Sequence, residues 1–286
     1  MSLTAGDVVR AAIANSVERF ANHEVGITEG DDPEDIHQAR VAARRLRSDL
    51  RTFHAFVDPE WSGSLRSELR WLGAELGAVR DTEVMLDRLR RHSDSLPDGE
   101  HAAVDVVLRR LVADWKRARQ ELQTAMLTER YHDLRERLDA AATNPKLGAD
   151  ADGPAKPLLR PVVRKPWRKL ERAVGALSAQ PPDEALHEVR IRAKRCRYAC
   201  EATEDVFGKA TRRFARAVAD VQDILGEHQD AVVARAWLAK TAEQCAANEA
   251  FAAGMLARVE AEAATVARAD FPKAWKRVHN RTPKWL

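Results

Sequence analysis

Five side chains that can carry positive charge recur at helical spacing between residues 37 and 51. They are His37, Arg40, Arg44, Arg47 and Arg51, spaced 3, 4, 3 and 4 residues apart. At about 100° of rotation per residue, this spacing places all five on one strip of an α-helix that is about 80° wide. Each guanidinium group on such a strip can hold two oxygens of one anionic group. The pattern therefore predicts an anion-binding face, here called the first basic row.

A second row of the same kind lies in the other half of the chain. This second basic row contains His187, Arg190, Lys194 and Arg197, and Glu201 stands at its fifth position. Like charges four residues apart destabilise a helix by a few tenths of a kcal/mol per pair. A solvated helix face would explain one such row, but two rows at equivalent positions favour a binding role.

The number of charges indicates what kind of anion would bind. An exposed ion pair is worth only about 0–1 kcal/mol, so one phosphate on one arginine binds weakly. Many contacts along a polymer add up, and release of counterions strengthens them. Proteins that read nucleic acids usually add aromatic platforms or donors to base edges, and Tyr198 is the one aromatic residue within either row. We therefore expect a long phosphate-rich polyanion, with nucleic acid not the primary ligand.

The composition indicates which elements carry these rows. Of the 286 residues, 45% are apolar, 32% are charged and only 6% are aromatic, which suits long amphipathic helices and an all-α fold. Helical periodicity predicts helices near 4–24, 33–56, 60–94, 99–142 (broken near 128–131), 158–178, 183–205, 208–246 and 248–278. We assign residues 1–145 and 158–286 to two four-helix bundles, and the Pro-, Gly- and Asp-rich segment 146–157 to a linker.

The two halves match each other in sequence. The segment IHQARVAARRLR (36–47) aligns with LHEVRIRAKRCR (186–197), and LGAVRD (76–81) aligns with LGEHQD (225–230). Apolar residues before the second motif share the spacing 4, 3 and 4 that marks an inward helical face. The match predicts an internal duplication that gives two pseudo-symmetric bundles.

Charge, cysteines and apolar runs exclude several classes of protein. The formal net charge is only +3, so anion binding must come from clustering. Cys196, Cys200 and Cys245 lack metal-ligand spacing, and the first two are expected to pack in the core. No run of about 18 apolar residues predicts a membrane span, and no signal peptide is recognised. We expect a cytoplasmic protein without a membrane partner.

Together the four motifs resemble the CHAD family, the conserved-histidine α-helical domain, over essentially the whole chain. The resemblance implies two pseudo-symmetric four-helix bundles and a basic surface that binds inorganic polyphosphate without transforming it. It also implies association with polyphosphate granules or with CYTH-type triphosphatase domains, whose own motif we do not find here. The chain departs from exact repetition at Gln229, which stands where the first half has Arg80.

These arguments define a set of expected polyphosphate-binding residues. The rows supply the direct contacts, and the third helix of each half supplies further cations. The resemblance adds Arg45 and Arg195 beside the rows and implies a binding role for the two histidines. The full set is His37, Arg40, Arg44, Arg45, Arg47, Arg51, Arg66, Arg70, Arg80, His187, Arg190, Lys194, Arg195, Arg197, Arg213 and Arg216. We expect no catalytic residue, metal ion or cofactor.

Some roles stay open at this level. His37 and His187 are either capping or packing residues or phosphate donors that gain charge with the ligand. Asp81 and Asp230 could hold Mg²⁺, but acceptors for neighbouring arginines are favoured. Arg45 and Arg195 lie about 120° from the centre of their rows and could face another helix. The rival functions are a nucleic-acid or other polyanion adaptor, a metal-dependent phosphohydrolase, and a scaffold for acidic protein tails.

Overall fold

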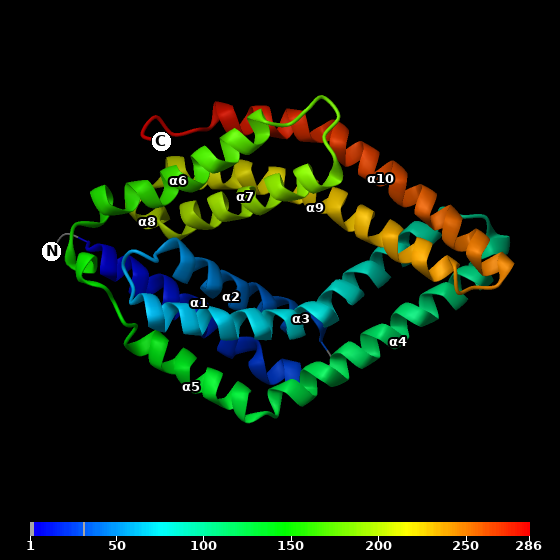
Figure 1. Cartoon of the computed structure of the whole chain (residues 1–286), viewed down its shortest axis with the longest axis horizontal. Coiled ribbons are helices and arrows are strands. Elements are labelled where there is room, and N and C mark those ends of the chain that lie inside the picture. The colour runs from blue at the N-terminus through cyan, green and yellow to red at the C-terminus, as the bar shows by residue number, and fades with distance from the viewer. Residues whose placement is uncertain (1–2, 31) are drawn as a thin grey trace.

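The structure, a computed structural model, describes residues 3–30 and 32–286, and in these ranges the chain is all-α without a β-strand (Figure 1). This confirms the predicted fold class. The helices are α1 (Ala5–Glu29), α2 (Pro33–Thr52), α3 (Pro59–Ser93), α4 (His101–Met126), α5 (Glu129–Thr143), α6 (Ala155–Gly175), α7 (Asp183–Ala202), α8 (Glu204–Phe207), α9 (Lys209–Ala242) and α10 (Ala247–Asn280). None of the helices in the described ranges combines the length and apolarity that a membrane crossing requires.

Polar side chains fix where the helices begin. Asp32 accepts a hydrogen bond from the backbone N–H of Glu34 at 2.9 Å, and Pro33 fills the first position of α2. Asp58 caps α3 in the same way. The helix predicted over 208–246 begins one residue later, because Gly208 has φ +73°, a conformation that favours glycine and separates α8 from α9.

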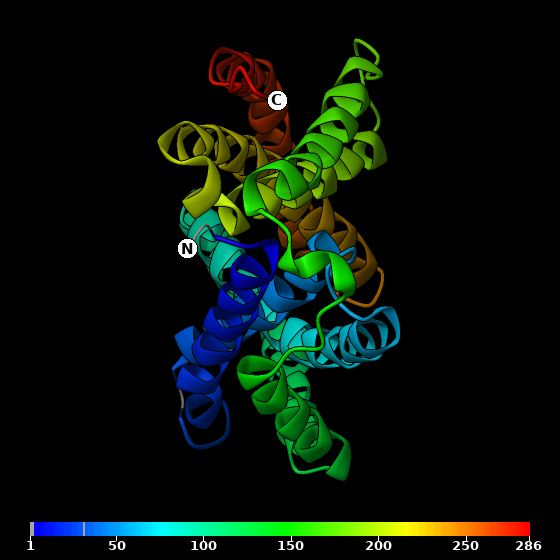
Figure 2. The same ribbon diagram turned by 90° about the vertical axis from the view of Figure 1, so that its left-hand side faces the viewer.

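The helices form two halves that share part of their core. The first half contains α1 to α5 and the second contains α6 to α10, and the two lie one above the other in both views (Figures 1 and 2). Each half has its own apolar core, and a third core joins α3 and α4 to α9 and α10. Leu89, Val107, Leu238 and Leu256 lie within this third core and are fully buried. The two halves are therefore packed together rather than joined by a free linker.

The segment between the halves is also fixed to its surroundings. It contains a short 3₁₀ helix, Ala149–Asp152. The backbone N–H of Gly148 donates to the carbonyl of Phe56 at 2.9 Å, and that of Ala155 donates to the carbonyl of Leu3 at 3.0 Å. The boundaries of the two bundles at 145 and 158 remain predictions, since the shared core crosses between them.

A buried ionic cluster supports the junction of the two halves. On α3, Arg88 donates from Nε to Glu260 of α10 at 2.6 Å and from Nη1 to Glu227 of α9 at 2.5 Å. The side chain of Glu260 is completely buried, and its other oxygen lies 2.8 Å from Nδ1 of His92. Removing one partner of a buried pair leaves the other charge desolvated without compensation.

We predict that Glu260→Ala lowers the free energy of unfolding by about 3–5 kcal/mol, because it strands the buried guanidinium of Arg88. Urea denaturation followed by circular dichroism measures the change. The control is Glu262→Ala on the same helix, where the pair with Arg258 is exposed and is worth less than about 1 kcal/mol. Equal destabilisation by the two substitutions would contradict the role of Glu260.

Candidate anion-binding surface

The two basic rows meet where the halves face each other. The first row lies on α2 and the second on α7, and these helices contact each other between the halves (Figure 1). Nε of Arg44 donates to the hydroxyl of Tyr198 at 3.1 Å, which ties the middle of the first row to α7. The rows therefore converge and do not point to opposite ends of the molecule.

One cavity lies between the rows, with a volume of about 450 Å³. Arg40 and Arg44 reach it from α2, and Arg190 and Lys194 reach it from α7. We call it the central cavity; its charged and amide-bearing lining consists of Arg40, Arg44, Asp81, Arg88, Asp114, Arg190, Lys194, Gln229 and Asp230. Five cations and three carboxylates leave the lining with excess positive charge.

Two glycines make room for two of these arginines. An added Cβ at Gly77 of α3 would lie 3.6 Å from both Nε and Nη2 of Arg40. An added Cβ at Gly226 of α9 would lie 3.4 Å and 3.5 Å from the same atoms of Arg190. The glycine of each Leu-Gly motif thus lets the guanidinium of its own half approach the neighbouring helix closely. The matching geometry supports the proposed duplication, which itself stays a prediction.

Crowding of cations shows in the pKa values of the first row. Burial lowers the pKa of Arg47, and Arg70, Arg66 and Arg44 lower it further. Burial also lowers the pKa of Arg51, together with repulsion from Arg195, Arg66 and Arg47. The arginines predicted on α3, Arg66 and Arg70, therefore lie beside the first row and extend the positive field beyond the central cavity.

Lys194 is the most strongly perturbed cation of the surface. Burial lowers its pKa to about 7, and the charges of Arg44, Arg190, Arg40 and Arg197 lower it further. Burial similarly lowers the pKa of His37, assisted by Arg80 and opposed by Glu34. Both shifts show that the surface already holds more positive charge than it can solvate, so a bound anion would favour the protonated forms.

Carboxylates neutralise part of the surface. Asp81 forms an ion pair with Arg40 at 2.9 Å, which confirms the acceptor role favoured for this residue. Asp230 is partly buried, and burial raises its pKa while Arg190 opposes the shift. Arg80 pairs with Glu83 at 3.2 Å. Asp81 and Asp230 thus lie beside the arginines that they are expected to orient.

The second row, like the first, has one arginine in an ion pair with a carboxylate. Arg197 lies 3.6 Å from Glu201, the acidic residue at the fifth position of that row. Asp223 lies close enough to Arg197 and Arg190 for both charges to oppose the rise in its pKa that burial causes. In contrast, the guanidinium groups of Arg47 and Arg51 form no ion pair with any residue that the structure describes. Arg190 and Lys194 of the second row also form no ion pair with a described residue, so each row keeps unpaired cations.

Several predicted residues have other surroundings. Arg45 turns away from its row and pairs with Asp49 at 3.2 Å and with Glu201 of α7, so it connects the two halves. Nδ1 of His187 lies 2.6 Å from Oε1 of Gln229, the residue that replaces an arginine in the second half. Arg195 lines a different cavity, described below.

Of the sixteen predicted residues, only Arg40, Arg44, Arg190 and Lys194 line the central cavity. Arg213 and Arg216 are exposed on α9 and do not belong to its lining. The sequence did not identify Arg88 of α3 as a residue of the site. Arg88 lines the central cavity and also holds the ionic cluster at the junction of the two halves. Its position seven residues after Asp81, two turns along the same helix face, was the available signal.

The cysteines behave as expected from their spacing. Cys196 and Cys200 are buried in the core of the second half, and all three cysteines are free. Packing of these two residues on the side of α7 opposite the row is what allows the basic side chains to face the first half.

Two curated proteins are similar to this chain in sequence. Two Mycobacterium tuberculosis proteins, Uncharacterized protein MT2285 (strain CDC 1551 / Oshkosh) and Uncharacterized protein Rv2226 (strain ATCC 25618 / H37Rv), are each 30% identical to the chain over 291 residues. Each match covers 97% of this chain and 54% of the relative. The chain thus spans about half the length of these curated relatives.

Two solved structures share the fold. PptA from Streptomyces chartreusis superposes with a TM-score of 0.81 at 26% identity, covering 96% of this chain and all of the other. The CHAD domain from the plant Ricinus communis superposes with a TM-score of 0.77 at 27% identity, covering 97% of this chain and 92% of the other. The family model of the CHAD domain matches residues 11–239, which confirms the resemblance of the motifs, and the chain belongs to the CHAD domain family.

Proposed function

We propose that this protein binds inorganic polyphosphate, without transforming it, on the central cavity and the basic rows beside it. The observation that carries the proposal is the convergence of the two rows, with Arg40 and Arg44 from one half and Arg190 and Lys194 from the other on one cavity. The ligand would bring the protein to cytoplasmic polyphosphate granules or beside triphosphatase domains that use the same polymer.

A polymer fits this surface better than a small anion. The first row spans about 21 Å along α2 at 1.5 Å per residue, and Arg66 and Arg70 widen it on the side of α3. A small anion can engage only a few of these cations at once, and each exposed contact is worth about 0–1 kcal/mol. A flexible chain of closely spaced phosphates can contact many cations together and release their counterions.

The carboxylates of the cavity support binding rather than hydrolysis. Asp81 pairs with Arg40, and Asp230 lies beside Arg190. Carboxylates in these positions hold guanidinium groups in place, which prepares the surface for phosphate oxygens. If long-chain polyphosphate became shorter during incubation with the protein and Mg²⁺ or Mn²⁺, the non-catalytic part of the proposal would be wrong.

We predict that Arg44→Glu and Lys194→Glu each weaken the binding of long-chain polyphosphate about tenfold or more, which corresponds to about 1.4 kcal/mol. Each substitution removes an attractive contact and adds a repulsive one in the central cavity. Isothermal titration calorimetry with polyphosphates of several lengths measures the effect. Wild-type affinity should increase with chain length and fall steeply as salt is added.

The control for this experiment is Lys276→Glu, which makes the same charge change at an exposed position of α10 outside the central cavity. It should leave the affinity nearly unchanged. Competition with a single-stranded oligonucleotide at equal charge concentration tests the ligand class. Displacement of bound polyphosphate by the oligonucleotide, without the reverse, would favour a nucleic-acid adaptor and contradict our proposal.

We predict that affinity for long-chain polyphosphate rises as pH falls from 8 to 6. The free protein has a Lys194 pKa of about 7 and a lowered His37 pKa, and bound phosphates favour the charged form of both groups. Both pKa values therefore rise in the complex, so binding takes up protons. Lys194 contributes above about pH 7, and His37 contributes at lower pH. Calorimetry in buffers of different ionisation enthalpy measures the number of protons taken up.

Two variants separate the contributions to this pH dependence. Lys194→Arg keeps the positive charge at all pH values, so proton uptake above pH 7 should disappear while binding is retained. The substitution His37→Ala should remove the part at lower pH. A flat profile in the wild-type protein that is unchanged in these variants would show that neither group is linked to binding.

A further inference from the structure

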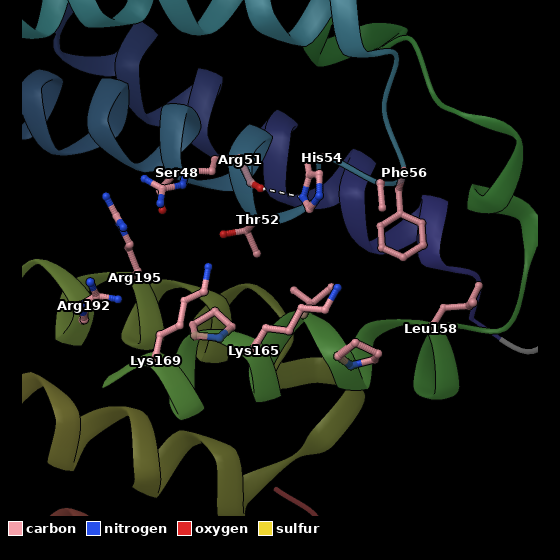
Figure 3. A pocket seen from close by; sticks show the side chains of 14 residues that line it. Ser48, Arg51, Thr52, His54, Phe56, Leu158, Lys165, Lys169, Arg192 and Arg195 are labelled. Atoms are coloured by element: carbon pink, nitrogen blue, oxygen red, sulfur yellow. Dashed lines mark hydrogen bonds between the residues drawn. The ribbon is translucent and has the colours of Figure 1, made fainter. Parts of the chain in front are cut away.

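A second cavity of about 350 Å³ lies between the end of α2 and helices α6 and α7 (Figure 3). It shares no lining residue with the central cavity. Its lining contains the cations Arg51, Lys165, Lys169, Arg192 and Arg195, and no acidic residue among those described. In Figure 3, Lys165 and Lys169 extend from α6 towards α2, where Arg51, Thr52 and His54 lie.

The cations of this cavity are largely free of internal partners. Arg192 is the exception, because its Nη2 lies 2.6 Å from Glu188, while its Nε is buried without a hydrogen bond. Lys165, Lys169 and Arg195 form no ion pair within the part of the chain that the structure describes. Repulsion from Arg195 also contributes to the lowered pKa of Arg51. The cavity therefore presents uncompensated positive charge to a ligand.

One wall of the same cavity is apolar. Phe56 and Leu158 lie at the end that Figure 3 shows farthest from Arg192, and Pro161 and Val162 of α6 complete the wall. An inorganic phosphate chain gains nothing from apolar surface, whereas burial of the apolar surface of an organic group is favourable. Small-molecule sites are typically concave, mostly apolar and supplied with a few polar groups that fix orientation.

We propose that the second cavity binds a nucleoside polyphosphate, with its phosphates among Arg51, Lys165, Lys169 and Arg195 and its base on the wall of Phe56, Leu158 and Val162. The hydroxyls of Ser48 and Thr52 lie in the same lining and can donate to phosphate or sugar oxygens. A nucleotide combines in one molecule the anionic chain and the flat apolar group that the cavity accommodates. This inference does not rest on polyphosphate binding at the central cavity.

The test compares adenosine triphosphate with inorganic tripolyphosphate by calorimetry on the full chain in magnesium-free buffer. The two ligands carry the same number of phosphates, and only one has a base. We expect adenosine triphosphate to bind about tenfold more tightly. Ala55→Trp fills the cavity from an exposed position without changing charge, and should abolish this advantage. Ala102→Trp, at an exposed position on α4, is the matched control and should retain it.

Charge variants locate the binding of the phosphates. Lys165→Glu with Lys169→Glu should weaken binding of adenosine triphosphate at least tenfold, whereas Lys194→Glu in the central cavity should not change it. Circular dichroism confirms that each variant is folded. Equal affinity for the two ligands, or an advantage that survives Ala55→Trp, would overturn the inference. Loss of polyphosphate binding in Lys194→Glu with unchanged nucleotide binding shows that the two proposals succeed or fail separately.

Discussion

Mutual repulsion among closely spaced cations is the interaction on which this structure depends. Burial, together with this repulsion, brings the pKa of Lys194 to about 7 and lowers the pKa values of Arg47 and Arg51. Without an opposing interaction, this repulsion would drive α2 and α7 apart. Three apolar cores, one of them shared by both halves, supply the opposing free energy and hold α2 and α7 together. The cations are therefore arranged before any anion binds, which reduces the entropy lost on binding.

Carboxylates pair the arginines that join the two halves, and one of these arginines, Arg88, also lines the central cavity. Arg45 pairs with Asp49 and Glu201, and Arg88 pairs with Glu227 and with the buried carboxylate of α10. Both partners of Arg88 lie on the opposite half, whereas Arg45 has one partner there, Glu201, and one on its own helix, Asp49. Arginines in this chain thus have two roles, joining the halves or remaining available to bind an external anion. The presence of a carboxylate nearby determines which role each arginine has. Pairing keeps the halves in register, while unpaired arginines of the first row stay available for an external anion.

The sequence predicted the helices well, because amphipathic periodicity and caps such as Asp32 are local. It also predicted both rows and the association of Asp81 with an arginine, since spacing along one helix fixes which side chains share a face. It could not predict how the faces of α2 and α7 cross. That crossing places Arg51 and Arg195 in a second cavity rather than the central one, and it brings Lys165 beside them. Contacts between distant helices depend on packing of the whole core, which no short motif encodes.

Two differences between the halves remove positive charge from the second half, whereas Arg192 adds one where the first half has Ala42. Where the first half has Arg80 and Arg51, the second has Gln229 and Glu201. Gln229 contacts His187, and Glu201 contacts both the second row and Arg45 of the first half. Each replacement removes a positive charge and adds an internal contact. Repulsion limits how many cations the adjoining helices α2 and α7 can carry together. Loss of positive charge on α7 therefore permits α2 to retain its positive charge. The first half therefore carries the longer row, while Arg190 and Lys194 of the second half contribute unpaired cations to the central cavity.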